Sequence, residues 1–332
     1  MKVLFDHPQP FALTHGGFQV QIEQTKGALE KIGVPVEHLR WWDDSQIGDI
    51  IHYFGRPLES YVRLAHAKNV KVVVGDLLSE LGSRSALARK GQKSIMTITK
   101  KVLPSSFRYR LGWNSFREAD ACVALTRWEG QLLMEMFGAR ADRVHVVPNG
   151  VEVEFLDSKP VVRGPWLVCT ATITERKRVV ELAEAAIQAR TPVWVIGKPY
   201  GEADAYADRF VKLAKQNPSL VRYEGPIKDR LALARIYREA RGFVLLSSME
   251  SLSLSALEAA ACECPLLLSD LPWARMTFGE EASYCAVPAS ASRTAPMLRC
   301  FYDQASSLPK PAKPLTWVEV AEALKSVYER VL

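Results

Sequence analysis

Residues 241–270, with the sequence RGFVLLSSMESLSLSALEAAACECPLLLSD, contain the pattern that decides the fold. The apolar run at 242–246 predicts a buried strand, a serine-rich loop follows it, and the alanine-rich stretch up to Cys262 predicts a helix. A second apolar run at 265–268 predicts the next strand. A strand, a helix and another strand in this order form a parallel β–α–β unit.

The same alternation extends over the rest of the chain. Further apolar runs, each separated by a helix-sized segment, predict strands at 2–5, 34–36, 49–54, 70–74, 121–125, 144–147, 166–169, 192–196 and 220–223. Strands that alternate with helices in this way are typical of parallel, doubly wound sheets. We therefore expect an α/β fold.

The chain length of 332 residues indicates about two domains. A proline–asparagine–glycine turn at 148–150 precedes an irregular stretch up to Pro165, which we interpret as the junction. We expect a Rossmann-like N-terminal domain over 1–155, a Rossmann-like C-terminal domain over 165–316 and a closing amphipathic helix over 317–332. Two such domains in tandem are expected to face a central cleft.

The composition is that of an ordinary folded protein. Hydrophobic residues make up 48% of the chain and charged residues 24%, which excludes an intrinsically disordered protein. The net charge of +6 favours anionic ligands or surfaces. No apolar run approaches a signal-peptide core or the roughly 18 residues of a membrane span. We expect a cytoplasmic protein, with any membrane contact peripheral and on the inner face.

Six cysteines are scattered along the chain, mostly in apolar runs. This distribution favours free thiols in a reducing compartment over a disulfide framework. Cys262 and Cys264 form the one close pair, and no further ligands stand at metal-binding spacing beside them. We therefore expect no metal site.

Two acidic residues mark the loop and the helix of the opening stretch. Glu250 follows the strand, and Glu258 lies in the helix eight residues later. The serines between them can cap the helix start, whose N–H groups and dipole suit a diphosphate. A carboxylate one to two turns into such a helix can accept hydrogen bonds from a ribose diol. Two glutamates at this spacing arise by chance about once in a chain of this length, so the surroundings must decide.

Those surroundings resemble glycosyltransferase family 4, a large retaining family with the GT-B fold. Glu250 and Glu258 match its Glu-x7-Glu motif, and residues 259–270 match the alanine-rich helix, short turn and strand that follow it. Residues 119–151 and 223–240 are similar to further family elements. The resemblance covers nearly the whole chain and implies an acceptor-side N-terminal domain and a C-terminal domain that binds a nucleotide sugar.

The implied reaction moves a sugar from a nucleoside-diphosphate sugar to an acceptor hydroxyl, with retention of anomeric configuration. No nucleophile–acid pair of the kind used by retaining glycosidases is evident. The resemblance implies front-face attack, in which the departing diphosphate helps to take the acceptor proton, and needs neither cofactor nor metal. The acceptor class stays open between a glycan, a lipid-linked acceptor and a small molecule.

The resemblance also implies individual roles. Lys177 matches the lysine that contacts the donor diphosphate, and Arg176 and Arg178 flank it. Glu250 would contact the sugar and, with Lys177, count among the catalytic residues, and Glu258 would bind the ribose. The remaining donor-binding candidates are backbone or loop contacts: Ser253, Leu254, Ile227, Gly197, Gly16 and Gly17. A surface charge run at Arg176–Arg178 and a plain turn at the glycine pair stay open as alternatives.

Two positions depart from the family pattern. Thr172 stands where the family usually has a second phosphate-binding arginine, and Gly75 stands where it commonly has a histidine near a strand end. Asp76 follows Gly75 and is our remaining catalytic candidate there. His52 and His7 end other strands and are candidates for lining the cleft, with a purely structural role as the alternative for each.

Residues 89–117 form a basic segment with interleaved aromatic residues and no acidic residue. Such a segment suits peripheral contact with an anionic membrane or another polyanion; contact with nucleic acid is a weaker interpretation, and a solvated surface is the plain alternative. Three other functions remain open for the whole chain. They are a GT-B epimerase, a degenerate protein that binds a nucleotide sugar without transfer, and a nucleic-acid-directed glycosyltransferase.

Overall fold

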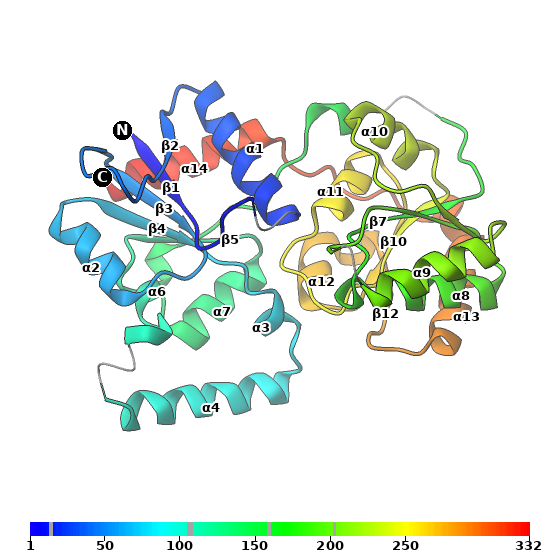
Figure 1. The fold of residues 1–332 in the computed structure, drawn as a ribbon, viewed down its shortest axis with the longest axis horizontal. Helices are drawn as coiled ribbons and strands as arrows, with labels where there is room; N and C mark the ends of the chain where they lie inside the picture. The colour runs from blue at the N-terminus through cyan, green and yellow to red at the C-terminus, as the bar shows by residue number, and fades with distance from the viewer. Residues whose placement is uncertain (13–15, 105–108, 158–160, 202–203) are drawn as a thin grey trace. The chain divides into compact units, whose positions relative to one another are not determined.

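The computed structural model describes residues 1–12, 16–104, 109–157, 161–201 and 204–332. They form two compact units, Met1–Asn149 together with Trp317–Leu332, and Gly150–Thr316 (Figure 1). The sequence placed the end of the first domain at residue 155, but residues 150–155 belong to the second unit. The reason is local: the Val151 N–H donates to the Leu315 carbonyl oxygen at 2.9 Å, and Phe155 is fully buried beside Tyr237.

The first unit contains a six-stranded, all-parallel sheet in the order β2-β1-β3-β4-β5-β6. Its strands are β1 (Val3–Asp6), β2 (Val36–His38), β3 (Ile50–Phe54), β4 (Lys71–Gly75), β5 (Ala121–Ala124) and β6 (Val144–Val146). Its helices of four or more residues are α1 (Gly17–Lys31), α2 (Glu59–Ala67), α3 (Ser79–Ser83), α4 (Ala86–Val102), α6 (Ser115–Glu118), α7 (Arg127–Phe137) and α14 (Trp317–Val331). The strands are almost continuously apolar because helices cover both faces of a parallel sheet.

The closing helix is part of the first unit, although it follows the second unit in the chain. Helices α1 and α14 pack side by side (Figure 1). The apolar face of α14 is buried at helical spacing, from Trp317 to Tyr328. The helix predicted over 317–332 is therefore observed, and its buried face completes the core of the first unit.

The second unit contains another six-stranded parallel sheet, in the order β12-β11-β10-β7-β8-β9. Its strands are β7 (Leu167–Thr170), β8 (Val193–Ile196), β9 (Val221–Tyr223), β10 (Gly242–Leu245), β11 (Leu266–Ser269) and β12 (Ser283–Cys285). Its helices are α8 (Val179–Ala189), α9 (Ala205–Gln216), α10 (Arg230–Glu239), α11 (Leu254–Ala261), α12 (Pro272–Phe278) and α13 (Ala291–Gln304).

In the unit's own numbering this order is 3-2-1-4-5-6, that of a Rossmann sheet. The order of the strands reverses between β7 and β10, which are hydrogen-bonded neighbours. Parallel α/β sheets bind ligands at the carboxyl ends of the strands beside such a reversal. The structure confirms the predicted class of two tandem Rossmann-like sheets and directs attention to the loops that follow β7 and β10.

Two further sequence expectations concern cysteines and membranes. Cys262 and Cys264 are buried free thiols, as are Cys122, Cys169 and Cys285, whereas Cys300 is exposed. In the part of the chain that the structure describes, no three His, Cys, Asp or Glu side chains gather as a metal-binding group. No helix in the described ranges has both the length and the apolarity needed to cross a bilayer.

Candidate functional site

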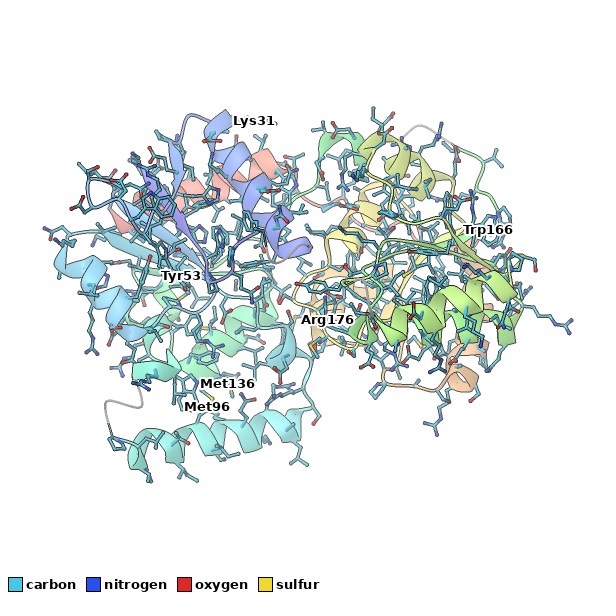
Figure 2. All side chains as sticks on the ribbon, in the orientation of Figure 1. Lys31, Tyr53, Met96, Met136, Trp166 and Arg176 are labelled. Atoms are coloured by element: carbon cyan, nitrogen blue, oxygen red, sulfur yellow. The ribbon has the colours of Figure 1, made fainter. Side chains whose placement is uncertain are left out.

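Two loops meet at the carboxyl ends of β7 and β10. After β7, residues 171–178 contain a short 3-10 helix over Glu175–Lys177; after β10, residues 246–253 lead into α11. The Ser248 N–H donates to the Arg176 carbonyl oxygen at 2.8 Å, and the Arg176 guanidinium donates to the Met249 carbonyl oxygen at 3.0 Å. Figure 2 places Arg176 at the opposite end of the second unit from Trp166, the residue before β7. Both loops are therefore held at the sheet edge where the strand order reverses.

An ion pair joins the two loops. The Lys177 ammonium contacts the Glu250 carboxylate, and Arg176 Nη1 lies 3.3 Å from the same Glu250 oxygen. Only 12% of the Lys177 side chain and 9% of the Glu250 side chain are exposed. Burial alone would raise the pKa of Glu250, but Lys177 and then Arg176 outweigh it, so its pKa lies below the ordinary value. Two cations around one ionised carboxylate leave a local positive charge, which suits an anionic group.

Helix α11 begins directly after this ion pair. Ser253 is its N-cap, and its buried hydroxyl accepts a hydrogen bond from the Ala256 N–H at 3.4 Å. Leu254, the first residue of the helix, is half-buried. The start of α11 therefore lies beside Lys177 and Glu250, and its backbone and dipole add to the attraction for an anion.

Glu258 lies one turn further along α11 and is buried. One carboxylate oxygen accepts from Arg230 at 2.5 Å and the other from the Tyr237 hydroxyl at 3.2 Å. Burial raises the pKa of Glu258, and Arg230 offsets only part of this effect. Arg230 also binds Glu152 at 2.8 and 3.0 Å and lies over the ring of Phe155. A carboxylate has about four acceptor positions, so Glu258 keeps capacity for a ligand hydroxyl.

The other predicted donor contacts differ in their surroundings. Arg178 donates to the Ala289 carbonyl oxygen at 2.6 Å, so its guanidinium is engaged with the loop after β12 and not with Glu250. Ile227 lies in the loop between β9 and α10 and is half-buried. Gly197 directly follows β8, and a Cβ atom there would lie 1.9 Å from the Ala171 carbonyl oxygen. Thr172, the departure from the family arginine, lies half-buried in the loop after β7.

The first unit has a small cavity of its own, at the carboxyl ends of β3 to β6. His52, Gly75, Asp76 and Asn149 line it, together with apolar residues of α14. Its volume of about 20 Å³ has room for one water-sized group.

His52 provides an unusual polar atom at this cavity. Its Nδ1 and the Tyr328 hydroxyl share a hydrogen bond of 2.6 Å, whereas its buried Nε2 has no partner among the described residues. Burial lowers the pKa of His52 to about 3, so its ring is neutral at pH 7. A side chain at Gly75 would begin 3.1 Å from His52 Nε2. The imidazole from β3 therefore occupies the space that a larger residue at the end of β4 would need.

The remaining first-unit candidates are tied to protein partners. Asp76 accepts two hydrogen bonds from the Arg56 guanidinium, at 3.0 and 3.3 Å. His7 bonds the Gln9 carbonyl oxygen at 2.7 Å and stacks on Phe11, and it does not line the cavity. The predicted glycine loop is the start of α1: Gly16 is the N-cap with φ of 137°, and Gly17 is the first helical residue. Positive φ at Gly16 gives a structural reason for glycine there.

Several residues of these sites were missed by sequence reasoning. Arg230, Glu152 and Tyr237 surround Glu258, and Arg56 and Tyr328 hold Asp76 and His52. Arg230 and Tyr237 lie within residues 223–240, which resemble a family element, but that resemblance gave neither of them a role. The other three are common polar residue types to which no motif gave a role. Only the fold brings Glu152 and Tyr328 to partners that are distant in the sequence.

Comparisons with known proteins relate the chain to glycosyltransferases. Residues 34–155 match the family model for "Glycosyltransferase Family 4", and residues 164–299 match "Glycosyl transferases group 1". A protein named D-inositol 3-phosphate glycosyltransferase from Thermomonospora curvata is 27% identical over 260 residues, covering 69% of this chain and 54% of that protein. A protein of the same name from Frankia alni is 32% identical over 166 residues, covering 44% and 40%. The chain thus spans about half the length of the curated relatives it matches.

Solved structures show the same fold over the whole chain. HepE from Anabaena, in complex with UDP and glucose, superposes with a TM-score of 0.65 at 14% identity, covering 99% of both chains. Sucrose-phosphate synthase from Thermosynechococcus elongatus gives a TM-score of 0.70 at 15% identity, covering 100% of this chain and 99% of that one. These similarities show that the chain, with its two Rossmann-like units, has the GT-B fold.

Proposed function

Because the chain belongs to glycosyltransferase family 4 and has the GT-B fold, we propose that it transfers a sugar from a nucleoside-diphosphate sugar to an acceptor hydroxyl. The second unit binds the donor at the carboxyl ends of β7 and β10. The first unit holds the acceptor. The donor base, the sugar and the acceptor class are left for experiment to identify.

One observation carries the proposal: Lys177 and Arg176 converge on Glu250 beside the Ser253-capped start of α11. Two cations and a helix N-terminus at one sheet edge suit the two phosphate groups of the donor. Glu258, deeper in the same helix, is placed to accept hydrogen bonds from the ribose. The HepE structure that contains UDP and glucose supports this assignment through the shared fold.

The proposed reaction retains the anomeric configuration and needs no metal. The bond between the anomeric carbon and the diphosphate oxygen breaks, and the acceptor oxygen bonds to the same face of that carbon. The acceptor proton moves to the departing diphosphate oxygen. Lys177 and Arg176 stabilise the charge that develops on this diphosphate, and Glu250 orients both the cations and the sugar hydroxyls.

For the acceptor we propose a hydroxyl compound that reaches the cavity of the first unit. His52 Nε2 has no hydrogen-bond partner within the described part of the chain, so a ligand hydroxyl can supply that hydrogen bond. Asp76 contributes less to acceptor binding than its position in the sequence implies, because its carboxylate already forms an ion pair with Arg56. It is a positioning residue in this proposal.

The test begins with a thermal-shift screen of UDP, GDP and ADP and of their common sugar conjugates. A ligand that binds only the folded state raises the melting temperature. The donor found in this way is then incubated with mono- and disaccharides, polyols and lipid-linked sugars. The anomeric coupling in the NMR spectrum of the product reports the stereochemistry.

Each outcome of the assay bears on the proposal. Transfer with retention supports it in full, and transfer with inversion rejects the mechanism but keeps the activity. Conversion of the donor sugar to its epimer, without any acceptor product, identifies an epimerase instead. A thermal shift with no turnover of any donor, under conditions where a control glycosyltransferase turns over its own donor, identifies a binding protein.

A further inference from the structure

Helix α4 has a composition unlike that of the other helices of the first unit. Its seventeen residues, Ala86–Val102, include five cations and no acidic residue. The Ser85 hydroxyl caps the helix by accepting from the Ala88 N–H at 3.3 Å. Figure 1 shows α4 at the rim of the first unit.

Two contacts fix the face that α4 turns toward its own unit. Met96 is buried, belongs to the core cluster of the first unit and lies near Met136 of α7 (Figure 2). Arg89 stacks over the ring of Trp128, at 4.5 Å from its centroid. At about 100° per residue these two side chains lie on nearly the same side of the helix.

Most of the apolar side chains of α4 point the other way. Leu87 is 82% exposed, Ile95 64%, Ile98 61% and Val102 74%. On a helical wheel these four fall within an arc of about 80°, whose centre lies roughly 140° from Met96. They form a narrow apolar stripe, which we call the α4 stripe, on the side away from the core.

Exposed lysines stand on one side of the α4 stripe. Lys90, Lys93 and Lys101 are exposed, and no ion pair between described residues includes any of them. An apolar stripe with cations beside it is the pattern of helices that lie in the plane of a membrane interface. The lysines meet anionic headgroups while the apolar side chains enter the acyl boundary.

We propose that α4 is a membrane-docking helix that binds the surface of an anionic lipid bilayer through Leu87, Ile95, Ile98 and Val102. Nucleic acid is a poorer fit, because its backbone would meet an apolar stripe and not a row of cations. A second protein is also a poorer fit, because four side chains are few beside the roughly 20–30 residues per side of a stable interface. The proposal does not depend on the donor site of the second unit.

This surface differs from the one that the sequence suggested for residues 89–117. Phe107 and Arg108 lie outside the described residues. Trp113 packs against the core of the first unit. The exposed apolar residues are aliphatic, and one of them, Leu87, precedes the basic segment.

Co-sedimentation of the full chain with vesicles tests the proposal. We expect binding to phosphatidylcholine vesicles that contain roughly 30 mol% of the anionic lipid phosphatidylglycerol. Binding to vesicles of phosphatidylcholine alone should be much weaker. Ile95→Ser/Ile98→Ser and Lys90→Gln/Lys93→Gln should each weaken binding at least about tenfold, since each lysine near an anionic surface contributes appreciably. Leu58→Ser/Leu64→Ser is the matched control, because it removes two exposed leucines at α2 of the same unit and should leave binding unchanged.

A second measurement locates the contact on the helix. In a Cys300→Ser background, which removes the exposed thiol, an environment-sensitive fluorophore is attached to Ile98→Cys or to Thr97→Cys. The label at position 98 should shift to the blue with anionic vesicles, and the label at 97 should shift far less. Equal shifts at both positions, equal binding of all variants, or binding to duplex DNA without binding to vesicles would each overturn the proposal.

Discussion

The carboxylates of Glu152 and Glu258 share one guanidinium. Arg230 bonds both, and Tyr237 completes the contacts of Glu258. Arg230 is thereby a positioning residue: it fixes the carboxylate that we assign to the ribose, and it links α10 and α11 to the start of the second unit.

Replacing this arginine tests that role. Arg230→Gln should lower the free energy of unfolding by about 1–3 kcal/mol, because it leaves a buried carboxylate without its charged partner. Urea denaturation measures this loss. The same variant should weaken nucleoside-diphosphate binding, and Arg230→Lys should restore part of both properties. Unchanged stability together with unchanged binding would show that Arg230 does not position Glu258.

His52 makes a prediction about pH. Its pKa in the folded protein is about 3, below the value of about 6.5 expected for an unfolded chain. As pH falls below 6.5 the unfolded chain takes up a proton that the folded chain does not, so stability falls with pH in this window. Between pH 7.5 and 5.0 the loss from this one group is about 2 kcal/mol.

The comparison with His52→Gln isolates this loss, because His38 and His145 are common to both proteins and their pKa values are also lowered by burial. Denaturation at the two pH values should show a fall in stability that is larger in the wild type. Parallel pH profiles for the two proteins would mean that His52 is protonated in the folded state or accessible to water.

The sequence singled out candidate residues for the donor site, but it did not give their contacts. Glu250 and Glu258 are candidates because they match a motif with fixed spacing, and Lys177 is a candidate because it matches a family lysine. The structure brings Lys177 and Glu250 together. The sequence could not tell which of Arg176 and Arg178 points toward Glu250, because the backbone conformation decides this. Arg178 has a positive φ of 54°. Likewise, only the parallel register of β3 and β4 reveals that His52 stands beside Gly75.

At the scale of elements, the loops after β7 and β8 pack so closely that one position must be glycine. The Gly197 backbone has φ of 155°, and its missing Cβ would fall 1.9 Å from the Ala171 carbonyl oxygen. This contact brings the ends of two neighbouring strands together beside the loop that bears Lys177.

Gly197→Ala should therefore separate these loops and destabilise the second unit. We expect a loss of more than about 2 kcal/mol, or a fall in melting temperature of roughly 4–8 °C. Gly201→Ala is the matched control, since a Cβ there meets nothing within 4 Å, and it should change the melting temperature little. Equal melting temperatures for the two variants would contradict the close packing.

Nearly all the strands were predictable because each is a short apolar run between turn signals. The missed strand, β12, has only the three residues Ser283–Cys285 and lies at the edge of its sheet. Edge strands need less apolar sequence than central ones, so the pattern that found β10 and β11 does not extend to it.

At the scale of the whole molecule, the chain leaves the first unit at Asn149 and returns to it at Trp317. The sequence predicted residues 317–332 as a closing helix but did not assign it to the first domain. Composition does not indicate against which core a terminal helix packs. Here α14 packs on α1, and the Tyr328 hydroxyl of α14 shares a hydrogen bond with His52.

Deleting residues 317–332 should consequently weaken the first unit and spare the second. Hydrogen exchange followed by mass spectrometry should show faster exchange in α1 and β3 of the truncated chain, with unchanged protection in α8. Faster exchange confined to the second unit would contradict the assignment of α14.

The central claim is that the second unit binds a nucleoside diphosphate through Lys177 and Glu258, and isothermal titration calorimetry with UDP, GDP and ADP tests it most directly. Lys310→Ala is the matched control, because Lys310 also pairs with a glutamate, Glu263, away from the loops after β7 and β10. We predict that one diphosphate binds the wild type and Lys310→Ala equally, and that Lys177→Ala and Glu258→Ala each lose at least about tenfold in affinity. Equal affinity in all four proteins, or no binding of any of the three diphosphates to the wild type, would contradict the account.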